Sequence, residues 1–133
     1  MRGNVFHNHM AKEAKAVFTR LNWTVYTEYC IQRNGVIIYY DLLAMMGNLL
    51  LGCQIETTPR HVIKNAKKAN AVAIPTWFVV PTRKVRNLVA AKLHPLNIRP
   101  GGEPIKLLLP GQLKQGVMNY LPLSTPANSW KGR

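Results

Sequence analysis

Acidic side chains are scarce in this sequence, and three of the five fall in segments that we predict to be β-strands. The five acids are Glu13, Glu28, Asp41, Glu56 and Glu103. Asp41 lies late in one apolar segment, and Gln54 and Glu56 alternate at the end of the next. If these segments are hairpin neighbours, strand alternation lets Asp41 reach the face that Gln54 and Glu56 share. Two carboxylates and an amide are hard oxygen ligands, so this edge is a candidate Mg²⁺ or Mn²⁺ site.

A helix is expected before these strands. Met10, Ala14 and Phe18 recur at a spacing of four residues, which is typical of an amphipathic helix, and Asn8 is a suitable cap for its start. Glu13 lies at the border of the apolar stripe. The helix could therefore bring one more carboxylate toward the metal site.

Three strands should follow this helix. Residues 24–31, 36–44 and 49–57 are rich in β-branched, aromatic and aliphatic side chains. Asn34-Gly35 and Gly47-Asn48 separate them, and such pairs favour tight turns between antiparallel strands. We therefore expect a three-stranded meander.

The next segments add helices and one more strand. Thr58-Pro59 predicts the start of a helix that runs to about residue 70. Residues 76–80 form a short apolar strand, and Thr82 caps a last helix ending near Leu93. A right-handed crossover would place that strand parallel to one of the first three. The order predicts an α/β fold, with a small mixed sheet flanked by helices.

Residues 95–133 have a different composition. Prolines and glycines recur at short intervals there and interrupt every potential long element. We therefore predict a core domain over residues 1–94 and a Pro/Gly-rich basic extension over residues 95–133. The extension could wrap the domain, pair with a partner or be partly mobile.

The charge balance indicates the kind of partner. Eighteen lysines and arginines against five acids give a formal net charge of +13. Since 47% of the residues are hydrophobic, the chain is not a disordered basic tail, and nucleic acid is the expected partner. The basic residues expected to contact phosphates lie on the second and last helices. They are Arg60, Lys64, Lys67, Lys68, Arg83, Lys84 and Arg86.

The remaining features point to an intracellular protein. The most apolar stretch, residues 36–52, contains Asp41, so no membrane span is expected. The first fifteen residues do not resemble a secretory signal. Cys30 and Cys53 are predicted to be buried, reduced thiols, which suits a cytoplasmic, nucleic-acid-associated protein. The run His7-Asn8-His9 is taken as a coincidental match to a nuclease motif.

The element order and these polar positions together resemble the PD-(D/E)XK superfamily of restriction-endonuclease-like nucleases. The resemblance covers residues 8 to about 92 and implies an αβββαβ core. It implies that Asp41 is the central metal ligand and that Glu13 is the acid from the first helix. Gln54 takes the place of the first acid of the third strand, and Glu56 takes the place of the lysine.

Two of these positions depart from the family pattern. Gln54 is neutral, although some branches of the superfamily use glutamine there. Glu56 would bind a metal or act as a general base. Lys64 is the candidate for a displaced lysine, with Lys67 and Lys68 behind it.

The expected function is a Mg²⁺- or Mn²⁺-dependent endonuclease that hydrolyses DNA phosphodiester bonds. Structure-guided or partner-guided cutting by a homodimer is expected, because one chain would carry one active site. The alternative is a catalytically inactive nucleic-acid-binding module of the same fold. A further alternative is a basic protein embedded in a ribonucleoprotein.

Overall fold

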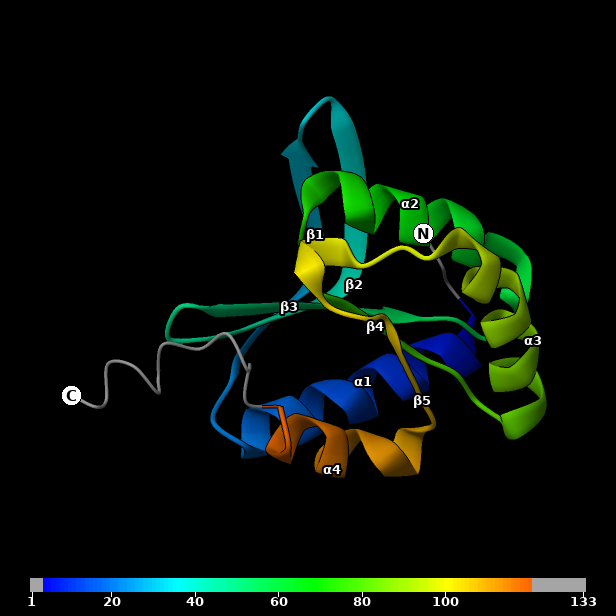
Figure 1. Cartoon of the computed structure of the whole chain (residues 1–133). Coiled ribbons are helices and arrows are strands. Elements are labelled where there is room, and N and C mark those ends of the chain that lie inside the picture. Colours follow the sequence, from blue (N-terminus) through cyan, green and yellow to red (C-terminus); the bar gives the residue numbers. More distant parts are fainter. Residues whose placement is uncertain (1–3, 121–133) are drawn as a thin grey trace.

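The computed structural model describes residues 4–120, and its elements follow the predicted order as far as Leu93 (Figure 1). The elements are α1 (Val5–Arg20), β1 (Thr24–Arg33), β2 (Val36–Met46), β3 (Leu49–Ile55), α2 (Val62–Val72), β4 (Thr76–Val79), α3 (Arg83–Leu93), β5 (Lys106–Leu108) and α4 (Leu113–Met118). None of the helices within the described range is long and apolar enough to cross a membrane.

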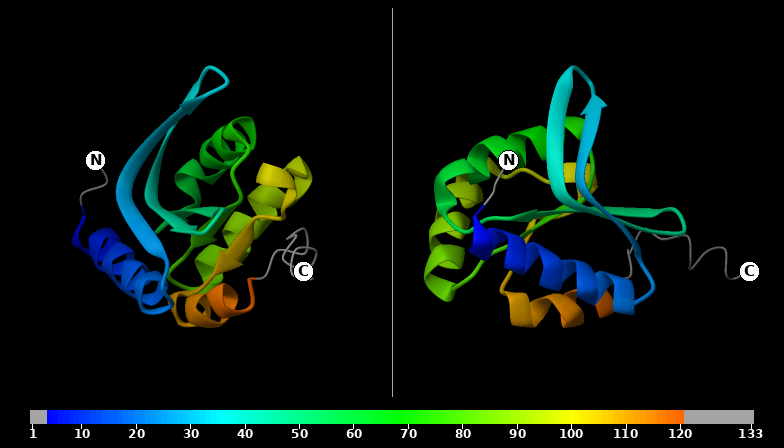
Figure 2. Two further views of the ribbon diagram at one scale, coloured as in Figure 1. Left: turned by 90° about the vertical axis from the view of Figure 1, so that its left-hand side faces the viewer. Right: turned by 180° about the vertical axis from the view of Figure 1, so that it is seen from behind.

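The strands form one mixed sheet in the order β1-β2-β3-β4-β5. β1, β2 and β3 are the expected antiparallel meander, whereas β4 pairs parallel to β3, and β5 parallel to β4. Helices α1 and α4 cover one face of the sheet, and α2 and α3 cover the other (Figure 2). The predicted small mixed sheet flanked by helices is therefore confirmed.

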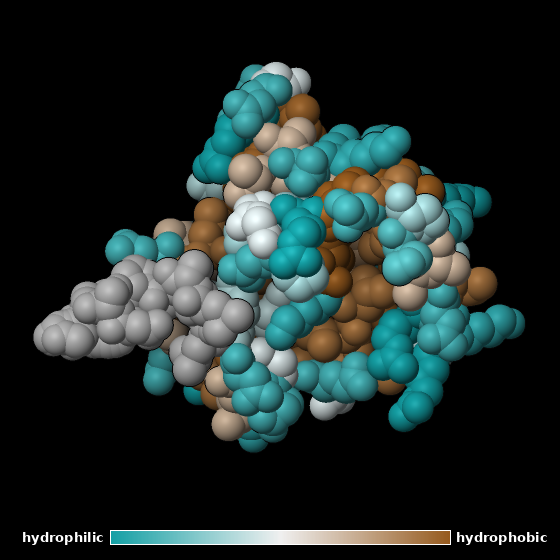
Figure 3. Space-filling view, viewed as in Figure 1, coloured by the Kyte–Doolittle hydropathy of each residue, from teal (hydrophilic) through white to brown (hydrophobic). Residues whose placement is uncertain are grey.

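Apolar side chains fill both layers between helices and sheet. Phe18 of α1 packs edge-on against Trp23, with ring centroids 5.7 Å apart, in the same cluster as Trp77. Both tryptophans are core residues. On the opposite face, Ala66 and Phe78 belong to the cluster under α2 and α3. One apolar area between α3 and β5 stays visible at the surface, surrounded by hydrophilic residues (Figure 3).

The first helix begins earlier than the sequence suggested. Asn4, not Asn8, is the cap, and its side-chain oxygen accepts a hydrogen bond from the His7 backbone N–H at 2.6 Å. The added turn extends the apolar stripe by three residues, from Met10 back to His7. His7 is consequently buried between helix and sheet.

The segment after Leu93 is not separate from the core in the described range. β5 extends the sheet, and α4 contributes Leu113 and Val117 to the cluster under α1. Tyr120 packs edge-on against Trp77, with ring centroids 5.3 Å apart. The prolines and glycines lie mostly around these short elements, so they limit the length of the elements without preventing them. The boundary expected after residue 94 is therefore not a boundary of the packed core, and residues 121–133 of the expected extension lie outside the described residues.

The two cysteines differ from each other. Cys53 is buried in β3, and burial, together with the nearby Asp41 charge, raises the pKa of its thiol. Cys30 is exposed, contrary to the prediction, because β1 is the edge strand and helices cover little of it. Neither cysteine is in a disulfide.

If α4 belongs to the core, Leu113→Ala should lower the free energy of unfolding by about 2–5 kcal/mol, because it deletes a side chain that is only 1% exposed. Met118→Ala is the matched control in the same helix, where the side chain is 53% exposed and the loss should be below about 0.5 kcal/mol. Denaturant unfolding measures both. Equal small losses would show that α4 is a dispensable appendage.

Candidate active site

The site is built where β2 and β3 part from each other. Their main-chain pairing ends at Leu42 and Cys53, and side chains then connect the strands. The Asp41 backbone N–H donates to Gln54 Oε1 at 3.1 Å, and Gln54 Nε2 donates to the Tyr39 carbonyl at 3.0 Å. In return, the Ile55 N–H donates to Asp41 Oδ2 at 2.7 Å. These three bonds fix the Asp41 carboxylate at the point where the sheet opens.

β1, the other strand that pairs with β2, is also irregular near Asp41. Residues on either side of Glu28 pair with Leu42 and Tyr40, but within this hairpin no such pair joins Glu28 to Asp41. Glu28 has a left-handed backbone, with φ of 49°. Tyr40 packs toward α2 and Leu42 toward α1, although a regular strand would place both on one face. Strained backbone of this kind is common at functional sites, and this irregularity supports Asp41 as a candidate site residue.

Tyr40 anchors β2 immediately before Asp41. Its hydroxyl is 2.7 Å from Thr76 Oγ1, and burial raises its pKa to about 12, so the phenol stays neutral. Its ring lies against Gly52, where an added Cβ would come within 2.3 Å of a ring carbon. Only glycine leaves room for this ring.

Two adjoining cavities share Asp41 as part of their walls. The larger has a volume of about 480 Å³, the smaller one of about 280 Å³, and both are also lined by His7 and Glu28. Asn65 and Lys68 of α2 line the larger cavity. Lys12 and Lys15 of α1 line the smaller one, along with Asn8, Ala11 and Thr27. Helices from both faces of the sheet therefore converge on one carboxylate that is 8% exposed.

Glu56 directly follows Ile55, the residue whose backbone N–H donates to Asp41. It is 1% exposed, and Asn65 Nδ2 donates to its Oε2 at 2.7 Å. Neither Glu56 nor Gln54 lines the two cavities. Gln54 therefore holds β2 in position through its hydrogen bonds, and the Glu56 carboxylate is bound by Asn65.

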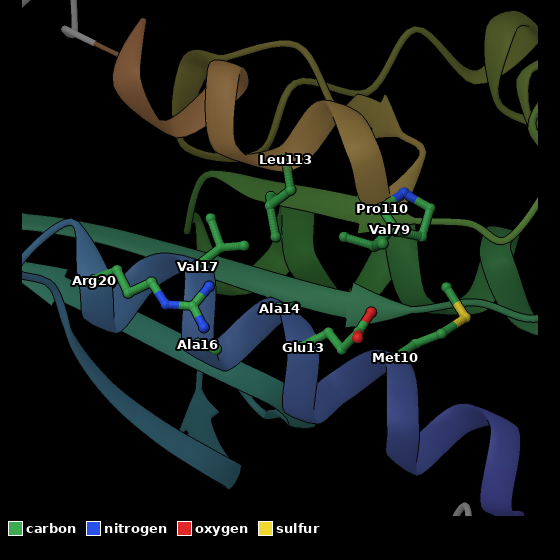
Figure 4. Close-up of a pocket in the computed structure, with 9 residues that line it drawn as sticks. All are labelled: Met10, Glu13, Ala14, Ala16, Val17, Arg20, Val79, Pro110 and Leu113. Atoms are coloured by element: carbon green, nitrogen blue, oxygen red, sulfur yellow. The ribbon is translucent and has the colours of Figure 1, made fainter.

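Two predicted site residues do not join the group. Glu13 is 62% exposed, lies 3.4 Å from His9, and lines a separate cavity between α1 and α4 with Arg20 (Figure 4). Lys64 is exposed and does not line the Asp41 cavities, whereas Lys68, one turn later, does. Both corrections have the same cause, because the rotation of a helix about its axis is set by packing.

His7 and Asn65 are the site residues that the sequence reasoning missed. His7 precedes Met10 by three residues on the stripe of α1, so extending the helix by one turn would have found it. Within His7-Asn8-His9, His7 is buried and His9 is exposed, so the run does not act as a unit. Asn65 had no signal of its own except its position three residues before Lys68.

The basic residues of the two later helices lie on one face of the sheet. The exposed ones are Arg60, Lys64, Lys67, Arg83 and Lys84. Arg86 is half-buried, and its guanidinium donates to Gln112 at 3.3 Å. Five of the seven residues of this predicted phosphate-binding set are therefore exposed.

Comparisons with known proteins bear on the fold. No family model matches the sequence, and no curated protein matches it significantly. The small subunit of the heterodimeric restriction endonuclease R.BspD6I is similar in structure, with a TM-score of 0.51 and 14% identity over 94% of this chain and 76% of that chain. A protein of unknown function, AF1548, has a TM-score of 0.49 and 11% identity over 90% of this chain and 74% of that chain. The chain has a restriction-endonuclease-like fold with the expected αβββαβ core.

Replacing Gln54 should reveal its bridging role. Gln54→Leu would leave the Asp41 N–H and the Tyr39 carbonyl without these partners, so the free energy of unfolding should fall by about 1–3 kcal/mol. Gln32→Leu on exposed β1 is the control and should change it by less than about 0.5 kcal/mol. Chemical denaturation compares the two variants, and equal stability would argue against the bridge.

Proposed function

We propose that this chain is a Mg²⁺- or Mn²⁺-dependent endonuclease of the PD-(D/E)XK superfamily that hydrolyses DNA phosphodiester bonds. The observation that carries the proposal is the Asp41 carboxylate, held by backbone N–H contact where β2 and β3 part. It lines cavities that also contain lysines from two helices. A fixed carboxylate beside positive side chains suits a phosphate bound together with a divalent ion.

The donor atoms fit such an ion. Asp41 Oδ2 accepts from Ile55, while Oδ1 lies 3.3 Å from the buried Nε2 atom of His7, which has no hydrogen-bond partner among the described residues. No group of three His, Cys, Asp or Glu side chains in the described range could hold a metal. Mg²⁺ commonly needs only one or two carboxylates, with waters and substrate phosphates completing its shell. Asp41 would hold the ion. The Glu56 carboxylate, which Asn65 binds, would add negative charge to the surroundings of the ion.

The side chains around Asp41 divide the remaining work. When bound, the ion supplies charge neutralisation and water activation for hydrolysis. Lys68 would contact the scissile phosphate from the wall of the larger cavity, and Asn65 would keep Glu56 in place. The exposed lysines and arginines of α2 and α3 would bind flanking phosphates without reading sequence.

A second subunit would be needed to cut both DNA strands, since one chain carries one Asp41. We therefore propose a homodimer or a partner-guided complex. The similar R.BspD6I chain is a subunit of a heterodimer, which agrees with this view. Sedimentation of the chain with DNA would test it, and a single bound chain that cuts both strands would contradict it.

Asp41→Asn tests the proposed activity. Asparagine can still accept from Ile55, so DNA binding should persist, whereas cleavage with Mg²⁺ or Mn²⁺ should fall by about a hundredfold or more. The substrates are linear, supercoiled, single-stranded and four-way-junction DNA. Glu103→Gln, which replaces an acid outside the proposed site, is the control variant. Undiminished cutting by Asp41→Asn would refute the proposal. Salt-dependent binding without any cutting by the unmodified chain would favour the inactive module.

Lys68 and Lys64 should separate catalysis from binding. Lys68→Gln removes a charge from the cavity wall and should lower the cleavage rate by about tenfold or more, since charged hydrogen bonds are strong. Lys64→Gln should change the rate by less than about threefold, and each variant should reduce the salt slope of DNA binding by at most about one. Cleavage kinetics at fixed salt measure the difference, and a larger loss in Lys64→Gln would reverse the assignment.

A further inference from the structure

The side chain of His7 is buried where the two cavities meet, and its Nε2 atom has no hydrogen-bond partner in the described part of the chain. Only 5% of the residue is exposed. Nε2 lies 3.3 Å from Asp41 Oδ1, but the two atoms do not have hydrogen-bond geometry. Because an unsatisfied buried nitrogen is unfavourable, this atom requires a partner from outside the described chain, such as a water or an ion.

The contact of the other ring nitrogen, Nδ1, indicates which of the two His7 nitrogens carries the proton. Nδ1 lies 3.4 Å from Asn8 Oδ1, and an amide oxygen can only accept. Nδ1 therefore carries the hydrogen, and in the neutral ring Nε2 presents a lone pair to the Asp41 carboxylate. A cation bound between these two acceptors would remove their mutual repulsion. Histidines that bind metals usually donate their second N–H in this way.

The spacing of the two acceptors also suits one ion. Two donors bound at about 2.1 Å on adjacent corners of an octahedron stand about 3 Å apart. The separation of 3.3 Å between Nε2 and Oδ1 is close to that value. Water and substrate phosphate would fill the other positions.

We propose that His7 and Asp41 together bind one divalent ion and that the imidazole makes the site prefer Mn²⁺ over Mg²⁺. Mg²⁺ favours oxygen ligands, whereas first-row transition metals accept imidazole nitrogen readily. His7 thus replaces the ligand that the chain lacks where Gln54 stands in place of an acid. The inference rests on the metal site of the proposed function but not on DNA cleavage.

Metal titration of the full chain tests this pairing. Electron paramagnetic resonance of free Mn²⁺ should report one bound ion, and competition should show Mg²⁺ binding about tenfold more weakly or worse. His7→Leu should weaken Mn²⁺ binding by about tenfold or more but change Mg²⁺ binding by less than about threefold. His9→Leu, an exposed histidine of the same helix, is the matched control and should leave both affinities unchanged. Unchanged Mn²⁺ affinity in His7→Leu would overturn the proposal.

A measurement on the unmodified chain covers the case in which His7→Leu fails to fold. Electron spin echo modulation of bound Mn²⁺ should show coupling to an imidazole nitrogen, and its absence would overturn the proposal. Nitrogen coupling without DNA cleavage would support the His7 site and contradict only the nuclease. Cleavage without nitrogen coupling would support the nuclease and overturn only the His7 site.

Discussion

A buried carboxylate holds together the part of the sheet on which the site depends. Asp41 accepts the Ile55 N–H after the main-chain pairing of β2 with β3 has ended, and Gln54 returns two bonds to β2. Without these contacts the separated strands would leave buried backbone groups unsatisfied. The opening is therefore stabilised by the same side chain whose second oxygen lies 3.3 Å from His7 Nε2. In the proposed function, Asp41 therefore has a chemical role as well as this structural one.

The glutamine of β3 gains a physical meaning from this arrangement. A carboxylate at position 54 could accept from the Asp41 N–H, but it could not donate to the Tyr39 carbonyl, and it would repel the Asp41 charge. The amide avoids both penalties and thereby makes the bridge more stable. With glutamine at position 54, the site holds one carboxylate fewer than it would with an acid there. The buried imidazole of His7 lies beside the Asp41 carboxylate.

Local signals predicted most of the fold. Asn34 and Gly35 both have positive φ, as the turn chemistry requires, and the Thr82 hydroxyl caps α3 by accepting the Val85 N–H at 3.2 Å. β5 could not be predicted, because a three-residue strand has no usable periodicity and forms only where the edge of β4 offers a partner. The spacing predicted that Asp41 and Gln54 lie close together, and a hydrogen bond joins them. The spacing did not predict His7 as a site residue and did not favour Lys68 over Lys64, since packing decides where a helix begins and which way it faces.

If Asp41 and His7 bind a divalent ion between them, anomalous diffraction from crystals soaked in Mn²⁺ should locate that ion. One anomalous peak is expected between Asp41 Oδ1 and His7 Nε2, at about 2.0–2.3 Å from each atom. A well-occupied Mn²⁺ elsewhere in the molecule, with no peak beside Asp41, would contradict it.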